Sequence, residues 1–311
     1  MSGPPLLGIV GPTASGKTDL ALALALARRL PAEVLVADSR QVYRGMDVGT
    51  AKPDAAARAA VPHHLLDLVD PDEPFTVAHW VQAARRLIPE IASRGRLAMV
   101  VGGTGLYVSA LVDGHDYASQ PWSPQVRARL ADELDTEGLE PLAARLRRLD
   151  PTTTVDLRNP RRVLRALERA EVGGGGVVPH ATPYAGAVTL IGLQRPRDVL
   201  YRRIDARAEA MFTDGGLLEE VRGLLDAGYS PDLGPMSGHG YREAAAHLAG
   251  EWPLEEAIEV TQRRTRQYAK RQLSWFGRDP RIQWLDAGDG PADAPALVDA
   301  AVDAARAAGY H

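Results

Sequence analysis

A glycine-rich segment near the start of the chain constrains the fold more than any other feature. Residues Gly11 to Thr18 read GPTASGKT and fit the pattern G-x-x-x-x-G-K-[ST] of a phosphate-binding P-loop. The apolar run Leu6 to Val10 precedes this segment, and a dense repeat of alanine and leucine from Thr18 to Leu30 follows it. The order strand, loop, helix is the context in which this pattern binds phosphate, so the segment predicts a phosphorylated ligand.

Each part of the motif has a physical role in holding an anion. Gly11 and Gly16 let the backbone bend so that successive N–H groups point at phosphate oxygens, and the positive end of the following helix adds to the attraction. Lys17 would neutralise the outer phosphate, and Thr18 would ligate Mg²⁺ through its hydroxyl. The predicted phosphate-binding stretch is Gly11, Pro12, Thr13, Ala14, Ser15, Gly16, Lys17 and Thr18.

Further short apolar runs predict the rest of an α/β core. We expect strands at 33–37, 97–101 and 188–193, separated by helical patterns, and later helices around 201–225 and 254–275. Strands that alternate with helices favour a parallel sheet flanked by helices, with ligands at the carboxyl ends of the strands. The alanine- and aspartate-rich stretch after Asp286 is interpreted as a surface helix or a frayed end. The predicted fold is thus a P-loop NTPase-like α/β core.

An inserted helical domain interrupts this pattern. From Pro121 to Glu171, leucine and valine recur at helical spacing among many arginines, and no strand pattern is visible. The run Gly173 to Gly176 suits a loop or hinge at its far edge. We therefore assign residues 1–115 and 190–311 to a discontinuous core and residues 116–189 to an inserted all-helical domain. Its arginines fit either contacts to nucleic-acid phosphates or a solvated helix face.

Composition excludes several classes of protein. The 311 residues include no cysteine, so disulfides, thiolate zinc sites and a cysteine nucleophile are ruled out. The first residues have neither a basic region nor an apolar run long enough for a signal peptide or a membrane span, so we expect a cytoplasmic protein without membrane contact. No coiled-coil pattern is present, and a monomer is expected. The net charge of -4 does not by itself indicate nucleic-acid binding.

Two strand ends carry the other candidate groups. The expected strand 97–101 ends in Gly102 and Gly103 where ATPases and kinases usually carry a carboxylate for magnesium, which suggests close approach of the backbone to a ligand and argues against nucleotide hydrolysis. Asp38 ends the strand 33–37 and is followed by Ser39, Arg40, Gln41 and Tyr43. Asp38 is a candidate general base, and the alternative, a cap of the next helical segment, is compatible with that role.

Five blocks of the sequence together resemble the tRNA dimethylallyltransferases, also called tRNA isopentenyltransferases. The blocks cover most of the chain in the family's order, and several together are more specific than a P-loop alone. They are GPTASGKT (11–18), ADSRQVYRGMDVGTAKP (37–53), PHHLLDLVDP (62–71), GGTGLYVSAL (102–111) and TRQYAKRQLSWF (265–276). The resemblance implies transfer of a dimethylallyl group from dimethylallyl diphosphate to N6 of the adenosine just 3′ of the anticodon, with release of diphosphate.

The resemblance also implies roles for individual residues. It places the diphosphate at Thr13 to Thr18 with Mg²⁺ at Thr18, and it gives catalytic roles to Asp38 as base and to Lys17, Thr18 and Arg207 at the diphosphate. Contacts to the tRNA anticodon stem-loop are implied for Asp38, Ser39, Arg40, Gln41, Thr104, Arg127, Arg161, Arg162, Arg165, Tyr241 and Arg242. The sequence departs from the family before Gly240 and Tyr241, where Gly238 and His239 replace the usual apolar residue.

Two alternatives remain from the residues alone. A small-molecule kinase would use ATP on the same P-loop, but it leaves the arginine-rich insertion without a role. A non-catalytic RNA-binding module with a degenerate P-loop is disfavoured by intact Lys17, Thr18 and Asp38. His63 and His64 are interpreted as structural, because no third ligand lies at a spacing typical of a metal site.

Overall fold

The chain divides into two compact units. The computed structural model describes residues 3–26, 30–115, 123–173 and 181–307. One unit comprises residues 1–113 and 183–311, and the other comprises residues 114–182. Residues 183–189, which the sequence analysis gave to the insertion, contact the core: Tyr184 donates its backbone N–H to Val112 O and its hydroxyl to Pro4 O. Most of the glycine run, 174–176, lies outside the described residues, and Gly173 ends helix α7.

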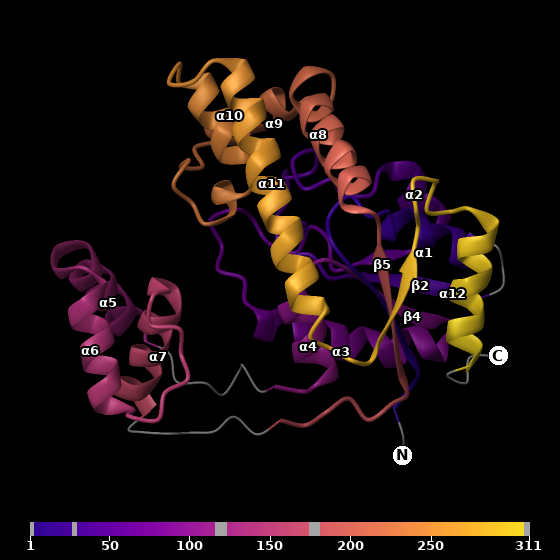
Figure 1. The fold of residues 1–311 in the computed structure, drawn as a ribbon, viewed down its shortest axis with the longest axis horizontal. Coiled ribbons are helices and arrows are strands. Elements are labelled where there is room, and N and C mark those ends of the chain that lie inside the picture. The colour runs from indigo at the N-terminus through magenta and orange to yellow at the C-terminus, as the bar shows by residue number, and fades with distance from the viewer. Residues whose placement is uncertain (1–2, 27–29, 116–122, 174–180, 308–311) are drawn as a thin grey trace. The chain divides into compact units, whose positions relative to one another are not determined.

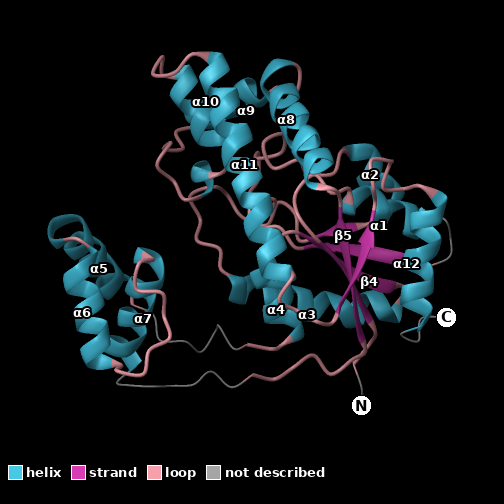
Figure 2. Ribbon diagram, in the orientation of Figure 1, coloured by secondary structure: helices cyan, strands magenta, loops and turns pink. Residues whose placement is uncertain are grey.

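A parallel sheet forms the centre of the larger unit (Figures 1 and 2). It has six strands in the order β3-β2-β4-β1-β5-β6. The strands are β1 (Leu6–Val10), β2 (Ala32–Val36), β3 (His63–His64), β4 (Leu97–Gly102), β5 (Val188–Gln194) and β6 (Ile282–Asp286). The four expected strands and the parallel α/β architecture are confirmed. The two edge strands were not expected, because β3 has only two residues and β6 follows a long helical stretch.

Helices cover both faces of this sheet. Alternate residues of β1 point to opposite faces, Leu6 and Val10 to one hydrophobic cluster and Leu7 and Ile9 to the other. Around the sheet lie α1 (Lys17–Leu26), α2 (Ala55–Ala60), α3 (Val77–Ser93), α4 (Gly105–Val112) and α12 (Pro295–Ala307). α3 and α4 contribute to the first cluster, and α1 and α12 contribute to the second.

The C-terminal helix α12 decides between two expectations. It is not a frayed end: it is a surface helix with one buried face, on which Ala301, Val302 and Ala305 are at most 1% exposed and belong to the same hydrophobic cluster as α1. Figure 1 shows α12 (yellow) beside the sheet. Small alanine side chains let the two helices approach closely, and the short side chains make such a helix look weakly apolar in the sequence.

A group of helices follows β5 in the same unit. Its members are α8 (Arg197–Thr213), α9 (Leu217–Asp226), the 3₁₀ turn η1 (Pro235–Ser237), α10 (Tyr241–Leu248) and α11 (Leu254–Phe276). α8 packs along α11, and α10 packs against both α9 and α11 (Figure 2). This arrangement brings residues from 195 to 275 close to the loops that follow β1, β2 and β4, which are far away in the sequence.

The smaller unit is a three-helix cluster formed by α5 (Pro124–Glu137), α6 (Leu139–Leu149) and α7 (Pro160–Gly173). Leu130, Leu142, Leu146, Val163 and Leu167 form its apolar core. The helical periodicity that predicted this region is thereby explained. No helix in the described part of the chain has the length and apolar character needed to cross a membrane.

Candidate functional site

The loop Gly11–Thr18 joins β1 to α1 and offers unpaired backbone donors. Gly11 and Gly16 have φ angles of 143° and 101°, and Ala14 adopts a positive φ of 62°, which is strained for a residue with a side chain. Within the described residues, no protein acceptor takes the backbone N–H groups of Ala14, Gly16, Lys17 and Thr18. Orphan N–H groups at a helix N-terminus form a site for an anion.

Lys17 begins α1 and lies beneath this loop. Its ammonium group donates a hydrogen bond to Pro12 O at 2.6 Å. Burial, together with the nearby Arg207 guanidinium, lowers the pKa of Lys17 to about 7, although Asp38 acts in the opposite direction. An anion bound at the loop would restore the charged form of this lysine.

Two side chains from later helices hold the loop at Thr13. Arg207, on α8, donates from Nη2 to Thr13 Oγ1 at 2.5 Å, and burial lowers the pKa of its guanidinium. Gln272, on α11, accepts the Thr13 N–H at 2.8 Å and donates to Gly103 O at 2.9 Å. Arg207 was predicted by resemblance. Gln272 was missed, although it lies in the quoted block 265–276.

Asp38 follows β2, at the carboxyl edge of the sheet beside the loop. Its Oδ1 accepts the backbone N–H groups of Arg40 at 2.8 Å and Gln41 at 3.4 Å. No helix begins here, so Asp38 closes a turn and does not cap a helix. Thr104 fixes the same turn, because its Oγ1 accepts the N–H of Ser39 at 3.1 Å. Asp38 thus has a defined orientation with Oδ2 free of these backbone bonds.

The two glycines after β4 are also required by close packing within the protein. A side chain at Gly102 would collide with Ala37 O at 2.1 Å, and one at Gly103 would collide with Gln272 Nε2 at 2.1 Å. Both glycines also line the cavity described below, so close approach of their backbone to a ligand stays a prediction. Neither Asp nor Glu occurs in the segment 102–105 that follows the strand.

A cavity of about 630 Å³ lies at the carboxyl edge of the sheet, in the larger unit. Predicted residues that line it are Thr13, Ala14, Gly16, Lys17, Thr18, Asp38, Gln41 and Arg207. Residues that the sequence analysis did not single out include Lys52, Arg203, Tyr268 and Gln272. Arg203 donates from Nε to Ala14 O at 3.0 Å, so a second arginine of α8 holds the loop. The helical period of α8 places Arg203 and Arg207 on one face, a signal that was available in the sequence.

Several residues predicted to contact tRNA make contacts within the protein. Arg40 donates to Gly234 O at 2.6 Å and to Ser237 Oγ at 3.2 Å. Tyr241 is 1% exposed and donates its hydroxyl to Glu220 at 2.6 Å, so its side chain belongs to the core, whereas Arg242 is exposed. Burial of the Tyr241 side chain makes a direct contact with tRNA unavailable in this conformation.

The predicted tRNA-binding arginines of the smaller unit fall into two pairs. Arg127 and Arg165 both form ion pairs with Glu168, which is 2% exposed, at 2.9 and 2.7 Å. Arg161 and Arg162, at the start of α7, are exposed. The first pair has a structural role in this unit, and the second pair is available to a partner.

The two adjacent histidines have structural contacts, as interpreted from the sequence. His64 Nε2 lies 2.7 Å from Glu33 Oε2, and His63 Nδ1 lies 2.7 Å from Val61 O. Within the described residues, no three histidine, aspartate or glutamate side chains are grouped closely enough to hold a metal ion. Any Mg²⁺ would depend on single protein oxygens, such as the hydroxyl of Thr18, together with oxygens of the substrate.

Comparisons with known proteins agree with this site. A family model described as IPP transferase matches residues 41–279, and one described as isopentenyl transferase matches residues 5–67. The tRNA dimethylallyltransferase of Roseiflexus castenholzii is 48% identical over 298 residues, which cover 94% of this chain and 95% of that protein. That of Geobacter sulfurreducens is 47% identical over 289 residues, which cover 90% of this chain and 91% of that protein.

Solved structures show the same likeness. The full-length tRNA isopentenylpyrophosphate transferase from Bacillus halodurans has a TM-score of 0.74 and 39% identity, covering 98% of this chain and 96% of that one. A eukaryotic dimethylallyltransferase, studied in crystals while acting on tRNA, has a TM-score of 0.77 and 26% identity, covering 96% of this chain and 78% of that one.

By its fold and its site, the chain is a P-loop α/β protein in which an anion-binding loop and a carboxylate line one cavity. The family models and the relatives go further. The chain belongs to the tRNA dimethylallyltransferase family, whose members are prenyltransferases. This membership argues against the small-molecule kinase and the non-catalytic RNA-binding module.

Proposed function

We propose that the protein transfers a dimethylallyl group from dimethylallyl diphosphate to N6 of the adenosine immediately 3′ of the anticodon in tRNA. The observation that carries the proposal is the shared cavity: the unpaired N–H groups of the P-loop, Lys17 and Arg207 face it from one side, and Asp38 lines it too. A leaving group that accumulates negative charge and a nucleophile that loses a proton need these two kinds of group.

The P-loop would bind the diphosphate of the substrate. The free N–H groups of Ala14, Gly16, Lys17 and Thr18 are donors for its oxygens, and Lys17 and Arg207 add positive charge. As the bond between the allylic carbon and the diphosphate oxygen breaks, these donors stabilise the charge on the departing diphosphate. The loop therefore holds a leaving group and needs no ATP.

Mg²⁺ fits the same end of the cavity. Thr18 is exposed and lines the cavity, and its hydroxyl is a hard oxygen donor of the kind that Mg²⁺ binds alongside phosphate oxygens and water. When bound there, Mg²⁺ would offset negative charge on the diphosphate. Thr18 would be its protein ligand.

Asp38 would act as the general base. The backbone bonds to Oδ1 orient its carboxylate. As the adenine N6 forms a bond to the allylic carbon, a proton passes from N6 to Asp38, which balances the departure of the diphosphate. The target adenosine has to leave the stack of the anticodon loop to reach this cavity.

Recognition of tRNA would use exposed basic residues, because phosphate contacts supply most of the non-specific affinity for nucleic acid. Arg161, Arg162 and Arg242 are exposed and meet this requirement. Ser39, Arg40, Gln41 and Thr104 form the turn beside Asp38 and would lie close to the target nucleotide. A monomeric state stays a prediction from the sequence.

The test combines product analysis with one variant. The purified protein, Mg²⁺, dimethylallyl diphosphate and unmodified tRNA are incubated, and the digested nucleosides are analysed by mass spectrometry for N6-dimethylallyl adenosine. Asp38→Asn keeps the shape of the side chain and should lower the transfer rate by about 10²- to 10⁴-fold, with tRNA affinity nearly unchanged. No product from the unaltered protein, together with ATP-dependent phosphorylation of a small molecule, would overturn the proposal.

A further inference from the structure

The carboxylate of Glu220, on α9, accepts hydrogen bonds from donors in distant segments of the chain. Oε2 accepts the backbone N–H groups of Asp47 at 2.8 Å and Val48 at 2.7 Å. Oε1 accepts the Gly49 N–H at 3.2 Å and the hydroxyl of Tyr241 at 2.6 Å. Four donors on two oxygens fix the carboxylate in one orientation, and hydrogen bonds to an ionised acceptor are the strong ones. Three successive backbone groups are thus held by one side chain.

The segment held by Glu220 continues into one wall of the cavity. Its next residues, Thr50, Ala51, Lys52, Pro53 and Asp54, all line the cavity. Ala51 has a φ of 53°, a strained conformation that the surrounding contacts must maintain. We call residues 46–54 the cavity wall.

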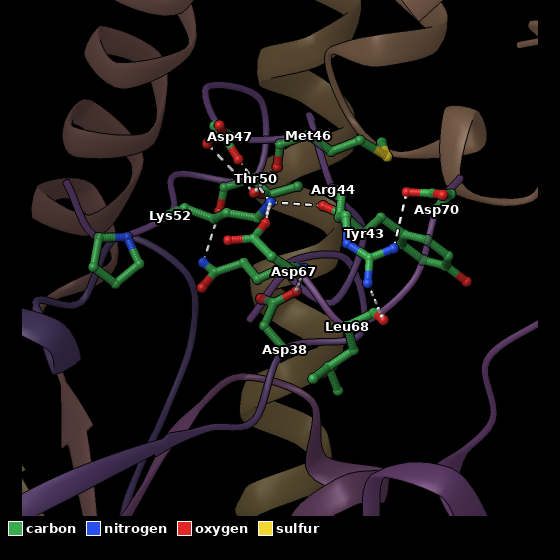
Figure 3. A network of polar contacts seen from close by, with 12 residues as sticks. Asp38, Tyr43, Arg44, Met46, Asp47, Thr50, Lys52, Asp67, Leu68 and Asp70 are labelled. Atoms are coloured by element: carbon green, nitrogen blue, oxygen red, sulfur yellow. Dashed lines mark hydrogen bonds and ion pairs between the residues drawn. The ribbon is translucent and has the colours of Figure 1, made fainter. Parts of the chain in front are cut away.

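A buried lysine also holds the cavity wall, through hydrogen bonds that its ammonium group donates. The Lys52 side chain is 1% exposed, and its ammonium group donates to Tyr43 O and Asp47 Oδ1 at 2.6 Å and to Asp67 Oδ1 at 2.5 Å (Figure 3). Thr50 Oγ1 closes a turn by donating to Met46 O at 2.6 Å. The wall is therefore tied at several points, and Glu220 supplies the contact to the helices α9 and α10.

A continuous set of hydrogen bonds leads from the cavity wall to Asp38. Gln41 Nε2 donates to Thr50 O at 2.9 Å and to Ala51 O at 3.3 Å. The backbone N–H of Gln41 in turn donates to Asp38 Oδ1. A shift of the wall would therefore move Gln41 and, with it, the turn that orients the Asp38 carboxylate.

We propose that Glu220 is a positioning residue for the transfer reaction: it holds the cavity wall and, through Gln41, the orientation of Asp38. The inference rests on the proposed function, in which Asp38 takes the proton from N6. Glu220 does not line the cavity. Its effect should consequently fall on the rate of transfer and not on the binding of the diphosphate, which we assign to the P-loop, Lys17 and Arg207.

The experiment compares Glu220→Gln with Glu219→Gln. Glutamine has one acceptor oxygen, so part of the four-donor set would face an NH₂ group, which cannot accept. Glu219 is the exposed neighbour on the same helix, and its change removes the same charge. We expect kcat of Glu220→Gln to fall about tenfold, with KM for dimethylallyl diphosphate changed by less than about twofold, and Glu219→Gln to match the unaltered protein.

Two further readouts separate positioning from a loss of folded protein. Hydrogen exchange should become faster at the amides of residues 47–49 and 38–43 in Glu220→Gln, while the amides of β1 and β4 stay protected. If the effect passes through Gln41, the double variant Glu220→Gln, Gln41→Ala should lose no more kcat than the more damaged single variant.

The outcomes are distinguishable. Equal kcat in Glu220→Gln and the unaltered protein, or fully additive losses in the double variant, would overturn the positioning role and leave the proposed function intact. The positioning role would also be overturned if kcat of Glu220→Gln equals that of the unaltered protein once it is expressed per folded molecule. If neither the unaltered protein nor Glu219→Gln transfers the dimethylallyl group, the proposed function fails and the positioning role fails with it.

Discussion

Arg195, which does not line the cavity, donates a hydrogen bond of 2.8 Å from Nε to the carbonyl oxygen of Ser15 in the P-loop. In a trans peptide the carbonyl oxygen and the next N–H point in opposite directions, so this bond aims the Gly16 N–H at the anion site. Arg195 is 6% exposed, and its Nη1 also donates to Gly290 O at 2.7 Å. A residue that does not line the cavity thus helps to shape its donors.

Arg195→Lys should therefore weaken diphosphate binding, although residue 195 does not line the cavity. Lysine cannot donate to Ser15 and to the loop around Gly290 together, and losing a charge-assisted hydrogen bond is worth about 1.5–3 kcal/mol. We expect KM for dimethylallyl diphosphate to rise about tenfold or more in steady-state kinetics. The exposed Arg202→Lys serves as a control on the next helix. An unchanged KM would show that the loop keeps its shape without Arg195.

Diphosphate affinity should fall as the pH rises above neutrality. Burial lowers the pKa of Lys17 to about 7 in the free protein, so Lys17 is charged below this pH and largely neutral above it. Binding the anion above pH 7 then requires uptake of a proton, and the dissociation constant should rise up to about tenfold per pH unit. Calorimetric titrations from pH 6 to 9 measure this, and Lys17→Ala corrects for titration of the ligand. If the dissociation constant rose with pH at the same slope in both proteins, the titration of Lys17 would not be its cause.

His239 should make the protein less stable in acid. Burial, with help from Arg264, Arg271 and Arg40, lowers its pKa to about 4, and its ring lies 5.2 Å from that of Tyr268. Because the unfolded chain takes up this proton at higher pH than the folded protein does, stability is lost as the pH falls from 6.5 towards 4. In urea unfolding, His239→Gln should reduce the loss of unfolding free energy between pH 7 and pH 4.5 by on the order of 1 kcal/mol. If both proteins lost the same unfolding free energy, His239 would take up its proton at the same pH in the folded and the unfolded protein.

Glu168 should stabilise the three-helix unit. It is 2% exposed and accepts from Arg127, Arg165 and the Ser123 N–H, and the two arginines hold its pKa below the usual range despite the opposing effect of burial. Glu168→Gln should destabilise α5 to α7 by about 2–4 kcal/mol, measured by hydrogen exchange in the full chain. The exposed pair of Glu140 and Arg147 offers the control, and Glu140→Gln should cost less than about 0.5 kcal/mol. Similar effects of the two changes would contradict the structural role.

The inner strands and the three-helix unit could be predicted because their patterns are local. Apolar runs gave β1, β2, β4 and β5, and helical periodicity gave α5 to α7. β3 was missed because two histidines carry no strand pattern. The buried face of α12 was not recognised because its small alanines look weakly apolar, although they pack against α1. The roles of Gly102 and Gly103 could not be read from the sequence either, because Ala37 and Gln272 approach them from distant parts of the chain.

The sequence by itself determined the phosphate-binding loop, since the bend, the lysine and the helix that follows lie within one short segment whose spacing contains the chemistry. It also supplied Asp38 as the group at the end of a neighbouring strand. Only the tertiary structure decided which polar residues line the cavity and which form contacts with other residues of the protein. Arg127 and Arg165 pair with Glu168, Tyr241 pairs with Glu220, and Glu220 holds Asp47 to Gly49. Apart from the Arg165–Glu168 pair, which spans one helical turn, these contacts join segments far apart in the chain, and they depend on burial and packing that no local spacing encodes.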